Sequence, residues 1–386
     1  MVDVQPLTAL RAVDLSTWIA GAYCTRLLAD GGASVTRVDP PGGHPLRRWS
    51  ASGSVPPGED GALYRHLTGD HHETDRDADD ARLHEVLAGA DACVWSPGGR
   101  LDPDAIVAAH PHLTVVAITP FGLDTPWSHR PATEFTLQGW SGGMIGLGRG
   151  TPDRPPVHVG GQVGEWLAGA YAAVALLAHR RTGTGGLVDL SALETQAMCL
   201  TYHPVTFHDL VGRPMRKKRA LTVPGVAAAS DGLVGLGVGT GQQWLDFCAM
   251  TGHPEWADDA SLFTERGALA PAIDAWVGER TSAEVLDMAS AFRLPNAPIV
   301  DGANATTIEH LRARECFTTR NGVLGPRSPI RLTAGPEPTD RVEASPQRRT
   351  GRAGPLPFSG LRVLDMTAYW AGPSASHLLA MLGAEV

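Results

Sequence analysis

Short apolar runs and one segment with helical spacing alternate between Leu10 and Asp39. Residues 11–15 have the apolar composition of a buried strand, and 34–39 read as a second strand. Between them, the small and apolar residues at 20–29 predict a helix that packs closely on a sheet. A strand, a helix and a parallel strand this compact form a right-handed unit, so we expect an α/β fold.

The turn that enters this helix bears on whether the unit could hold a dinucleotide. Ser16 and Thr17 are suited to cap the helix, and an acidic residue, Asp39, ends the second strand. The turn lacks the GxGxxG pattern, however, and Trp18 would crowd a pyrophosphate. The glycine run at 237–241 is a lone and weak signal. The sequence therefore disfavours a nicotinamide oxidoreductase, which NAD-dependent protection against heat would reveal.

The same alternation continues through the first two hundred residues. It predicts strands at 91–95, 113–118 and 187–190, and helices at 81–88, 104–109 and 165–181. The last helix is apolar nearly all round, which predicts a central and buried position. The stretches 41–80 and 123–164 are predicted to be rich in loops. Strands that alternate with helices indicate a mostly parallel sheet.

The character of the chain changes after residue 205. Glycine and valine alternate at 223–239, which predicts a small sheet, followed by helices at 242–250, 271–277 and 283–289 and a short strand at 296–300. We therefore predict a large α/β domain at 1–205, a smaller α+β domain at 206–324, a return segment at 325–334 and a linker at 335–360. The linker is rich in Pro, Gly, Arg and Glu and has no periodicity.

The opening of the chain is repeated near residue 386. Residues 361–386 align with 10–35 without a gap at a constant offset of 351, and eleven of the 26 positions are identical. Asp14 and Asp365 correspond in this alignment. A match of this length predicts that 361–386 is the truncated start of a second copy, and that the chain is the N-terminal copy of a tandem protein.

Composition excludes several classes of function. A net charge of −9 argues against general nucleic-acid binding. Five scattered cysteines without a CxxC pair favour a reducing cytoplasm and argue against structural zinc. The adjacent His71 and His72 lack HExxH spacing, so no metal site is predicted. The N-terminus lacks a signal peptide, and no apolar run is long enough for a membrane span, so we expect a cytoplasmic protein without a membrane partner.

Six short motifs together are specific. They are Val38–Gly43, Ala90-Asp91 with Pro97-Gly98, Thr119–Gly122, Gln138–Gly143, Arg180–Asp189 and Asp231-Gly232 with Trp244. In this order they resemble the class III CoA-transferases, the group of formyl-CoA transferase, carnitine CoA-transferase and acyl-CoA racemase. The resemblance covers residues 8 to about 333, and it begins again at 361.

The resemblance implies a Rossmann-like large domain, a smaller domain, and two subunits threaded through each other as interlocked rings. It implies a homodimer, or a pseudo-dimer within a tandem chain. Coenzyme A and acyl-CoA would be substrates, with a carboxylic acid as acceptor and no permanently bound cofactor. The residues expected to contact CoA are Ile19, Ala20, Arg47, Arg48 and Arg65.

In the family, an Asp at the start of the central helix forms a mixed anhydride and then a CoA thioester. The matching position here is Glu165. A carboxylate at a helix N-terminus is expected to be held ionised by the dipole and to act as a nucleophile. Glutamate is one methylene longer than aspartate, and a misplacement of that scale can cost about 100-fold in rate.

Two alternatives follow from the departures from the family pattern. Thr133 and Glu134 stand where the racemases have a His-Asp pair, so racemase chemistry is not expected in this half. The first alternative is a CoA-transferase that uses Glu165. The second is a non-catalytic scaffold whose partner copy, beyond residue 386, would supply an Asp.

Overall fold

The structure is a computed structural model that describes residues 4–69, 72–73, 79–146, 157–201, 208–212, 224–258, 266–333, 355–368 and 370–386. The chain divides into two compact units, which are described separately. The first comprises Met1–Leu147, Val157–Met215 and Thr318–Val386, and the second comprises Gly148–Pro156 and Arg216–Phe317.

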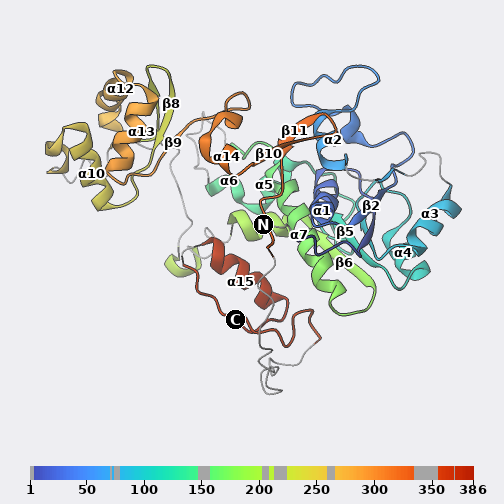
Figure 1. The fold of residues 1–386 in the computed structure, drawn as a ribbon. Helices are drawn as coiled ribbons and strands as arrows, with labels where there is room; N and C mark the ends of the chain where they lie inside the picture. Colours follow the sequence, from blue (N-terminus) through green and yellow to red (C-terminus); the bar gives the residue numbers. More distant parts are fainter. Residues whose placement is uncertain are drawn as a thin grey trace, which may run out of the picture. The chain divides into compact units, whose positions relative to one another are not determined.

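A six-stranded parallel sheet forms the centre of the first unit (Figure 1). Its strands are β1 (Arg11–Leu15), β2 (Ser34–Arg37), β3 (His72–Glu73), β4 (Ala92–Trp95), β5 (Thr114–Thr119) and β6 (Gly186–Ser191). Their order is β3-β2-β1-β4-β5-β6, and each pair of neighbours runs parallel. This is the order of a Rossmann fold, so the predicted α/β class with a parallel sheet is confirmed.

Helices cover both faces of this sheet. On one face lie α1 (Ile19–Asp30) and α7 (Val163–Arg180), and on the other lie α3 (Asp80–Ala88) and α4 (Pro103–Ala109). Gly169 brings the first two helices together, because a Cβ at this position would lie 2.5 Å from the carbonyl oxygen of Ala20. The start of α7 is therefore held close to the start of α1.

The prediction that α7 is buried throughout is only half correct. Its face toward the sheet is buried, including Ala168, Ala172 and Leu176. On the other face, Val174 and Leu177 are 37% and 36% exposed. The apolar composition of α7 therefore indicates that one face of the helix packs tightly, but it does not show that both faces are buried.

Three helices occupy stretches that were predicted to be loops. They are α2 (Ala62–Thr68), α5 (Glu134–Ser141) and α6 (Gly143–Gly146), and a 3-10 turn, η1 (Pro45–Arg48), lies in the same region as α2. Thr133 begins α5 with a capping box that it forms with Thr136, and Gly142 ends the helix in the left-handed conformation. Both end signals are present in the sequence, but neighbouring glycines obscure them.

The predicted cap of α1 is wrong. Trp18 is the N-cap residue and makes no side-chain capping bond. The hydroxyl of Ser16 donates instead to Asp14, and the backbone N–H of Thr17 donates to the Ser96 hydroxyl on the neighbouring loop. Polar partners from β1 and the turn after β4 draw both residues away from the helix, which leaves its first N–H groups open to another acceptor.

The first unit also contains two short helical segments and a hairpin. Helix α8 (Ala192–Gln196) leads into the π-helical turn η2 (Ala197–Thr201). The hairpin is formed by β10 (Phe317–Arg320) and β11 (Val323–Pro326). Asn321 at its tip donates a hydrogen bond to the carbonyl of Gly69, just after α2. The returning chain is therefore fastened to the large unit at this point.

The second unit has its own three-stranded antiparallel sheet. Its strands are β7 (Val226–Ala229), β8 (Gly232–Leu236) and β9 (Asn296–Pro298), and its helices are α10 (Gly241–Thr251), α12 (Ala270–Gly278), α13 (Ser282–Ala291) and α14 (Glu309–Ala313), with the 3-10 turns η3 (Pro254–Ala257), η4 (Arg266–Leu269) and η5 (Ala305–Thr307). Thr240 and Gln243 form the capping box of α10. The glycine run at 237–241 thus leads into a helix cap.

The segment from 358 to 386 repeats the geometry of the first β-strand and helix. Helix α15 (Ala371–Met381) corresponds to α1. Arg362 and Glu385 pair in parallel, as Arg11 and Ser34 do. The offset in both pairs is the 351 residues found in the sequence alignment.

The polar turn is repeated as well. Asp14 accepts hydrogen bonds from the backbone and hydroxyl of Ser16 and from the hydroxyl of Thr25. Asp365 accepts the same three bonds from the residues at the matching positions, Thr367 and Ser376. The two segments therefore share backbone register and side-chain hydrogen bonds as well as sequence.

Candidate active site

Glu165 lies in the first turn of α7, at the junction with α1. The turn begins at Gln162, which has a left-handed backbone with φ of 60° and provides no side-chain cap. The Oε2 atom of Glu165 accepts a hydrogen bond of 3.0 Å from the backbone N–H of Ala20, in the first turn of α1. One carboxylate thus lies at the N-terminal ends of two helices.

The helix dipoles do not keep this carboxyl group acidic. Burial raises the pKa of Glu165 to about 7, the Ala20 N–H opposes this, and the neighbouring Glu134 raises it further. The expectation that Glu165 is held ionised is therefore wrong. Desolvation and a second carboxylate outweigh two favourable helix ends, so the group exchanges its proton near neutral pH.

Glu134, on α5, is the second carboxylate of the site. Its Oε1 atom accepts a 2.8 Å bond from the backbone N–H of Gly164, the residue before Glu165. Gln138 and Gln196 also donate to Glu134, at 2.7 and 3.3 Å. Because the sequence predicted loops at 123–164, the role of Glu134 and Gln138 was missed; Thr133, an N-cap residue followed by an acid, was the available signal.

Ile19 and Ala20, predicted to contact CoA, occupy the first turn of α1. The side chain of Ile19 is 1% exposed and packs with Leu46 and Tyr64. Ala20 is also buried, and its N–H binds Glu165. The structure thus brings Ala20 and the candidate nucleophile together, whereas Ile19 is almost fully buried and its contact with CoA stays a prediction.

The three predicted arginines have partners within the protein. Arg47 binds Asp39 at 2.8 Å and Asp60 at 2.6 Å. Arg48 is exposed and donates to the carbonyls of its own loop at residues 55, 56 and 59. Arg65 donates to the carbonyl of Asn321. Their contact with CoA phosphates stays a prediction, and Arg47 would have to leave two carboxylates to make it.

A chain of buried ion pairs lies beneath the carboxyl ends of β1 and β2. Arg37 is 1% exposed and binds Asp14 at 2.6 Å and Asp39 at 2.8 Å. Burial acts to raise the pKa of Asp39, but Arg37 and Arg47 lower it below its ordinary value. The acid that would bind a ribose in a dinucleotide site is therefore occupied by two guanidinium groups.

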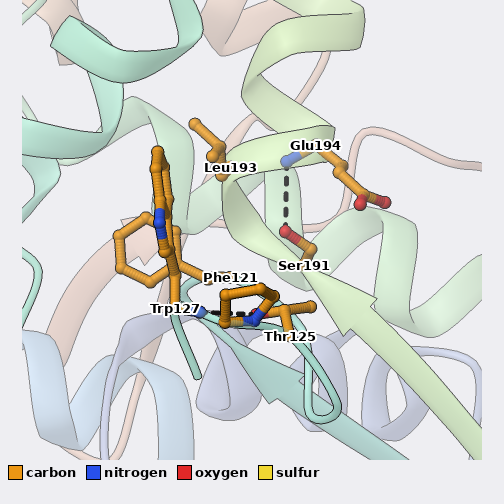
Figure 2. Close-up of a pocket in the computed structure, with 7 residues that line it drawn as sticks. Phe121, Thr125, Trp127, Ser191, Leu193 and Glu194 are labelled. Atoms are coloured by element: carbon orange, nitrogen blue, oxygen red, sulfur yellow. Dashed lines mark hydrogen bonds between the residues drawn. The ribbon is translucent and has the colours of Figure 1, made fainter. Parts of the chain in front are cut away.

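A separate cavity of about 240 Å³ lies beside the loop after β5 (Figure 2). Its lining consists of Phe121, Thr125, Pro126, Trp127, Ser191, Leu193 and Glu194. Phe121 and Trp127 meet edge to face, with ring centroids 5.5 Å apart. The lining contains a carboxylate and no basic side chain, so it is unsuited to hold the phosphates of CoA.

Metal sites and membrane spans can be described only for the residues that the structure describes. Within them, no group of three or more histidine, cysteine or acidic side chains is arranged to hold a metal ion. The described helices also include none that is long and apolar enough to cross a membrane. The adjacent His71 and His72 are not open to this test, because residue 71 lies outside the described ranges and nothing is described of the side chain of residue 72.

Comparison with known families identifies the chain. The model of CoA-transferase family III matches residues 7–349 and, separately, 358–386. The chain belongs to CoA-transferase family III. The second range is the repeated segment, so the family model matches this chain in two places, the second time over the stretch that copies 10–35.

Relatives of this family III chain carry CoA-transferase names. A probable CoA-transferase of Mycobacterium tuberculosis is 30% identical over 94% of this chain and 51% of its own length. The chain thus spans about half of that relative. An acetyl-CoA:oxalate CoA-transferase of Acetobacter aceti is 26% identical over 90% of this chain and 94% of its own length.

Solved structures of the family share the fold. A CAIB/BAIF family protein from Brucella suis superimposes with a TM-score of 0.73 and is 24% identical, covering 86% of this chain and 93% of its own. At this identity the likeness establishes the architecture of the family III fold. The chemistry must be argued from the residues of this chain.

Proposed function

We propose that this chain moves coenzyme A between an acyl-CoA and a carboxylic acid, with Glu165 as the covalent nucleophile. The observation that carries the proposal is the position of its carboxylate, which lies in the first turn of α7 and is bound to the first turn of α1 by the Ala20 N–H. Membership of CoA-transferase family III supports the reaction class.

The reaction would begin with attack by the free carboxylate oxygen of Glu165 on the thioester carbon. The new C–O bond replaces the C–S bond, which releases CoA thiolate and leaves a mixed anhydride. The thiolate then attacks the side-chain carbonyl of Glu165, expelling the original acid and forming a glutamyl-CoA thioester. An acceptor carboxylate repeats the two steps in reverse order and leaves as its CoA thioester, which regenerates the carboxylate.

The hydrogen bond from Ala20 fits both halves of this cycle. It engages Oε2, so the other carboxylate oxygen remains for attack on the thioester. When the thiolate adds to the side-chain carbonyl, negative charge develops on an oxygen of the same group. A backbone N–H at a helix N-terminus is suited to stabilise that charge.

The pKa of Glu165 sets a condition on this chemistry. Because burial raises the pKa to about 7, Glu165 is less fully ionised at neutral pH than an ordinary glutamate. A carboxylate of higher basicity is also the stronger nucleophile, so part of this cost is recovered in the attack. The proposal therefore requires a rate that rises as Glu165 loses its proton.

Intact-protein and peptide mass measurement tests the proposal. Wild type and Glu165→Gln are incubated with acetyl-CoA or succinyl-CoA and then trapped with hydroxylamine, which converts an anhydride or a thioester into a hydroxamate. A hydroxamate at Glu165 in the wild type, absent from the variant, is the expected result. Turnover without a modification at this residue would overturn the assignment.

A second candidate is a non-catalytic half within a tandem chain. The observation that favours it is the repeated segment at 358–386, which matches the family model and reproduces the hydrogen bonds of Asp14 at Asp365. In this case two copies would form an interlocked pseudo-dimer, and a carboxylate of the second copy would react. The same trapping experiment on a longer protein that contains both copies would then label the second copy and leave Glu165 unmodified.

A further inference from the structure

The carboxylate of Glu134 joins three elements around the start of α7. It accepts the N–H of Gly164 from α7 at 2.8 Å, the amide of Gln138 from α5 at 2.7 Å and the amide of Gln196 from α8 at 3.3 Å. Gly164 immediately precedes Glu165, so this group of bonds ends one residue from the candidate nucleophile.

These bonds replace a cap that α7 does not provide for itself. Gln162 makes no side-chain capping bond, so the first N–H groups of the helix need acceptors from elsewhere. Glu134 provides one, and its negative charge is favourable at a helix N-terminus. Gln138 fixes the preceding segment, because it accepts the N–H of Val159 at 2.8 Å and donates to the carbonyl of the same residue at 2.9 Å.

The packing at Gly164 leaves little freedom for this arrangement. A Cβ at Gly164 would overlap the amide of Gln196 and lie 2.7 Å from Oε2 of Glu134. The Oε1 atom of Gln196 is buried without a hydrogen-bond partner in the described part of the chain. An unpaired buried acceptor is destabilising, so such an exception in a native structure calls for an explanation.

We propose that Glu134 is a positioning residue for Glu165: it caps the start of α7 from α5 and places a second carboxylate beside the nucleophile. The inference rests on the proposed function of Glu165. Glu134 itself forms no bond to the substrate in this scheme. It acts through the backbone of Gly164 and through its charge.

The charge of Glu134 gives the proposal a measurable consequence. After burial, Glu134 is the group that raises the pKa of Glu165, while the N–H of Ala20 lowers it. Within the described residues, Glu134 is the charged side chain that acts on this pKa. Tyr23 on α1, which packs on Trp166, and Gln196 on α8, which binds Glu134, carry no charge at neutral pH. Removing the charge should therefore move the titration of Glu165 toward acid pH.

Three substitutions separate charge from position. Glu134→Gln keeps an oxygen for the Gly164 N–H but removes the charge, Glu134→Ala removes both, and Glu134→Asp keeps the charge on a shorter stem. Glu85→Gln, on the exposed side of α3, is the matched control for loss of one carboxylate. Circular dichroism confirms that each variant is folded.

Infrared titration follows the protonated carboxyl band that Glu165→Gln lacks, without requiring turnover. We expect its midpoint to fall in Glu134→Gln and to stay in Glu85→Gln. With acyl-CoA, we expect kcat of Glu134→Ala to drop about 100-fold, the cost of a misplacement near 1 Å, with KM nearly unchanged and partial rescue in Glu134→Asp.

A wild-type midpoint in folded Glu134→Gln, or a wild-type kcat in Glu134→Ala, would overturn the positioning role. Failure of the proposed function is distinguishable from this result. In that case hydroxylamine would trap no adduct at Glu165, whereas the infrared midpoint would still respond to Glu134.

Discussion

The backbone N–H of Ala20 and the carboxylate of Glu165 are 3.0 Å apart, although 145 residues separate them in the chain. The bond joins the first turns of two helices, neither of which has a side-chain cap from its own N-cap residue. A carboxylate shared by two helix ends is stabilising in its charged form, yet burial and Glu134 still raise its pKa. The hydrogen bond from Ala20 thus favours the ionised form of Glu165, whereas burial and Glu134 favour the protonated form.

The rate of acyl transfer to Glu165 should rise with pH through a midpoint near 7, because only the carboxylate attacks and burial raises the pKa to about 7. Single-turnover trapping with hydroxylamine between pH 5.5 and 8.5 would measure this rate, with substrate held above saturation. A rate independent of pH over this range would contradict the prediction.

Glu165 should make the stability of the protein fall with rising pH, whereas it makes the rate of acyl transfer rise. The folded protein holds the proton of Glu165 more tightly than the unfolded chain, so its contribution to stability is fully present below about pH 4.5 and is lost as the pH rises through about 7. Urea unfolding of wild type and Glu165→Gln at several pH values checks this. The difference between their free energies of unfolding should change over this window and be constant outside it.

Gly164→Ala should reduce both stability and activity. The new Cβ would overlap the amide of Gln196 and approach Glu134, and overpacking of this kind typically costs about 1–3 kcal/mol. Gly160→Ala is the matched control, since a Cβ there meets nothing within 4 Å. Urea midpoints and kcat measured on both variants decide the matter. Equal behaviour of the two would show that the Gln196 contact is not restrictive.

Arg37→Met should lower the free energy of unfolding by about 3–5 kcal/mol, because it leaves Asp14 and Asp39 buried without their shared guanidinium group. Arg11→Met removes an exposed arginine that lies 3.6 Å from Asp91, and it should cost about 0–1 kcal/mol. Urea unfolding of both variants compares the buried and the exposed ion pair directly. A small loss for Arg37→Met would mean that its apolar stem and tight packing matter more than its charge.

The repeated segment allows one substitution at two matched places. Asp14→Asn breaks the buried pair with Arg37 and should cost about 3–5 kcal/mol. Asp365 accepts from the backbone N–H and hydroxyl of Thr367 at one oxygen and from the hydroxyl of Ser376 at the other. The amide oxygen of Asn can accept the first two bonds and its NH2 group can donate to the Ser376 hydroxyl, so Asp365→Asn should leave the urea midpoint of the 386-residue chain near the wild-type value. A comparable loss in both variants would contradict this difference.

The exposure of the two segments explains the contrast. Leu364 and Met366 are 83% and 87% exposed, whereas their counterparts Val13 and Leu15 are 1% and 0% exposed. The first segment pairs with neighbouring strands and is covered by helices. The second segment has the same sequence pattern and the same local hydrogen bonds, but Leu364 and Met366 remain exposed. Burial therefore depends on the elements that pack against a segment, and not on its own sequence alone.

Five of the six strands of the parallel sheet, and the helices that cover it, could be predicted from the sequence because their signals are local; β3 (His72–Glu73) lies in a stretch that was predicted to be rich in loops. The signals are properties of short segments: hydrophobic alternation of period two or 3.6, glycine after the last helical turn, and runs of β-branched residues. They located β4, β5 and α7 within one or two residues. Helix α5 was missed because its Gly139 and the glycines after Ser141 resemble a loop, although Thr133 caps it. The repeated segment and the family motifs could also be identified from the sequence.

Tertiary structure alone decided how the polar residues are used. Ser16 and Thr17 are good caps in isolation, yet Asp14 and Ser96 bind them. Arg47 has the charge to hold a phosphate, yet its guanidinium group forms ion pairs with Asp39 and Asp60. A local pattern fixes which face of a segment is apolar, but hydrogen-bond partners and the pKa of Glu165 depend on groups distant in sequence, whose positions only the packed structure sets.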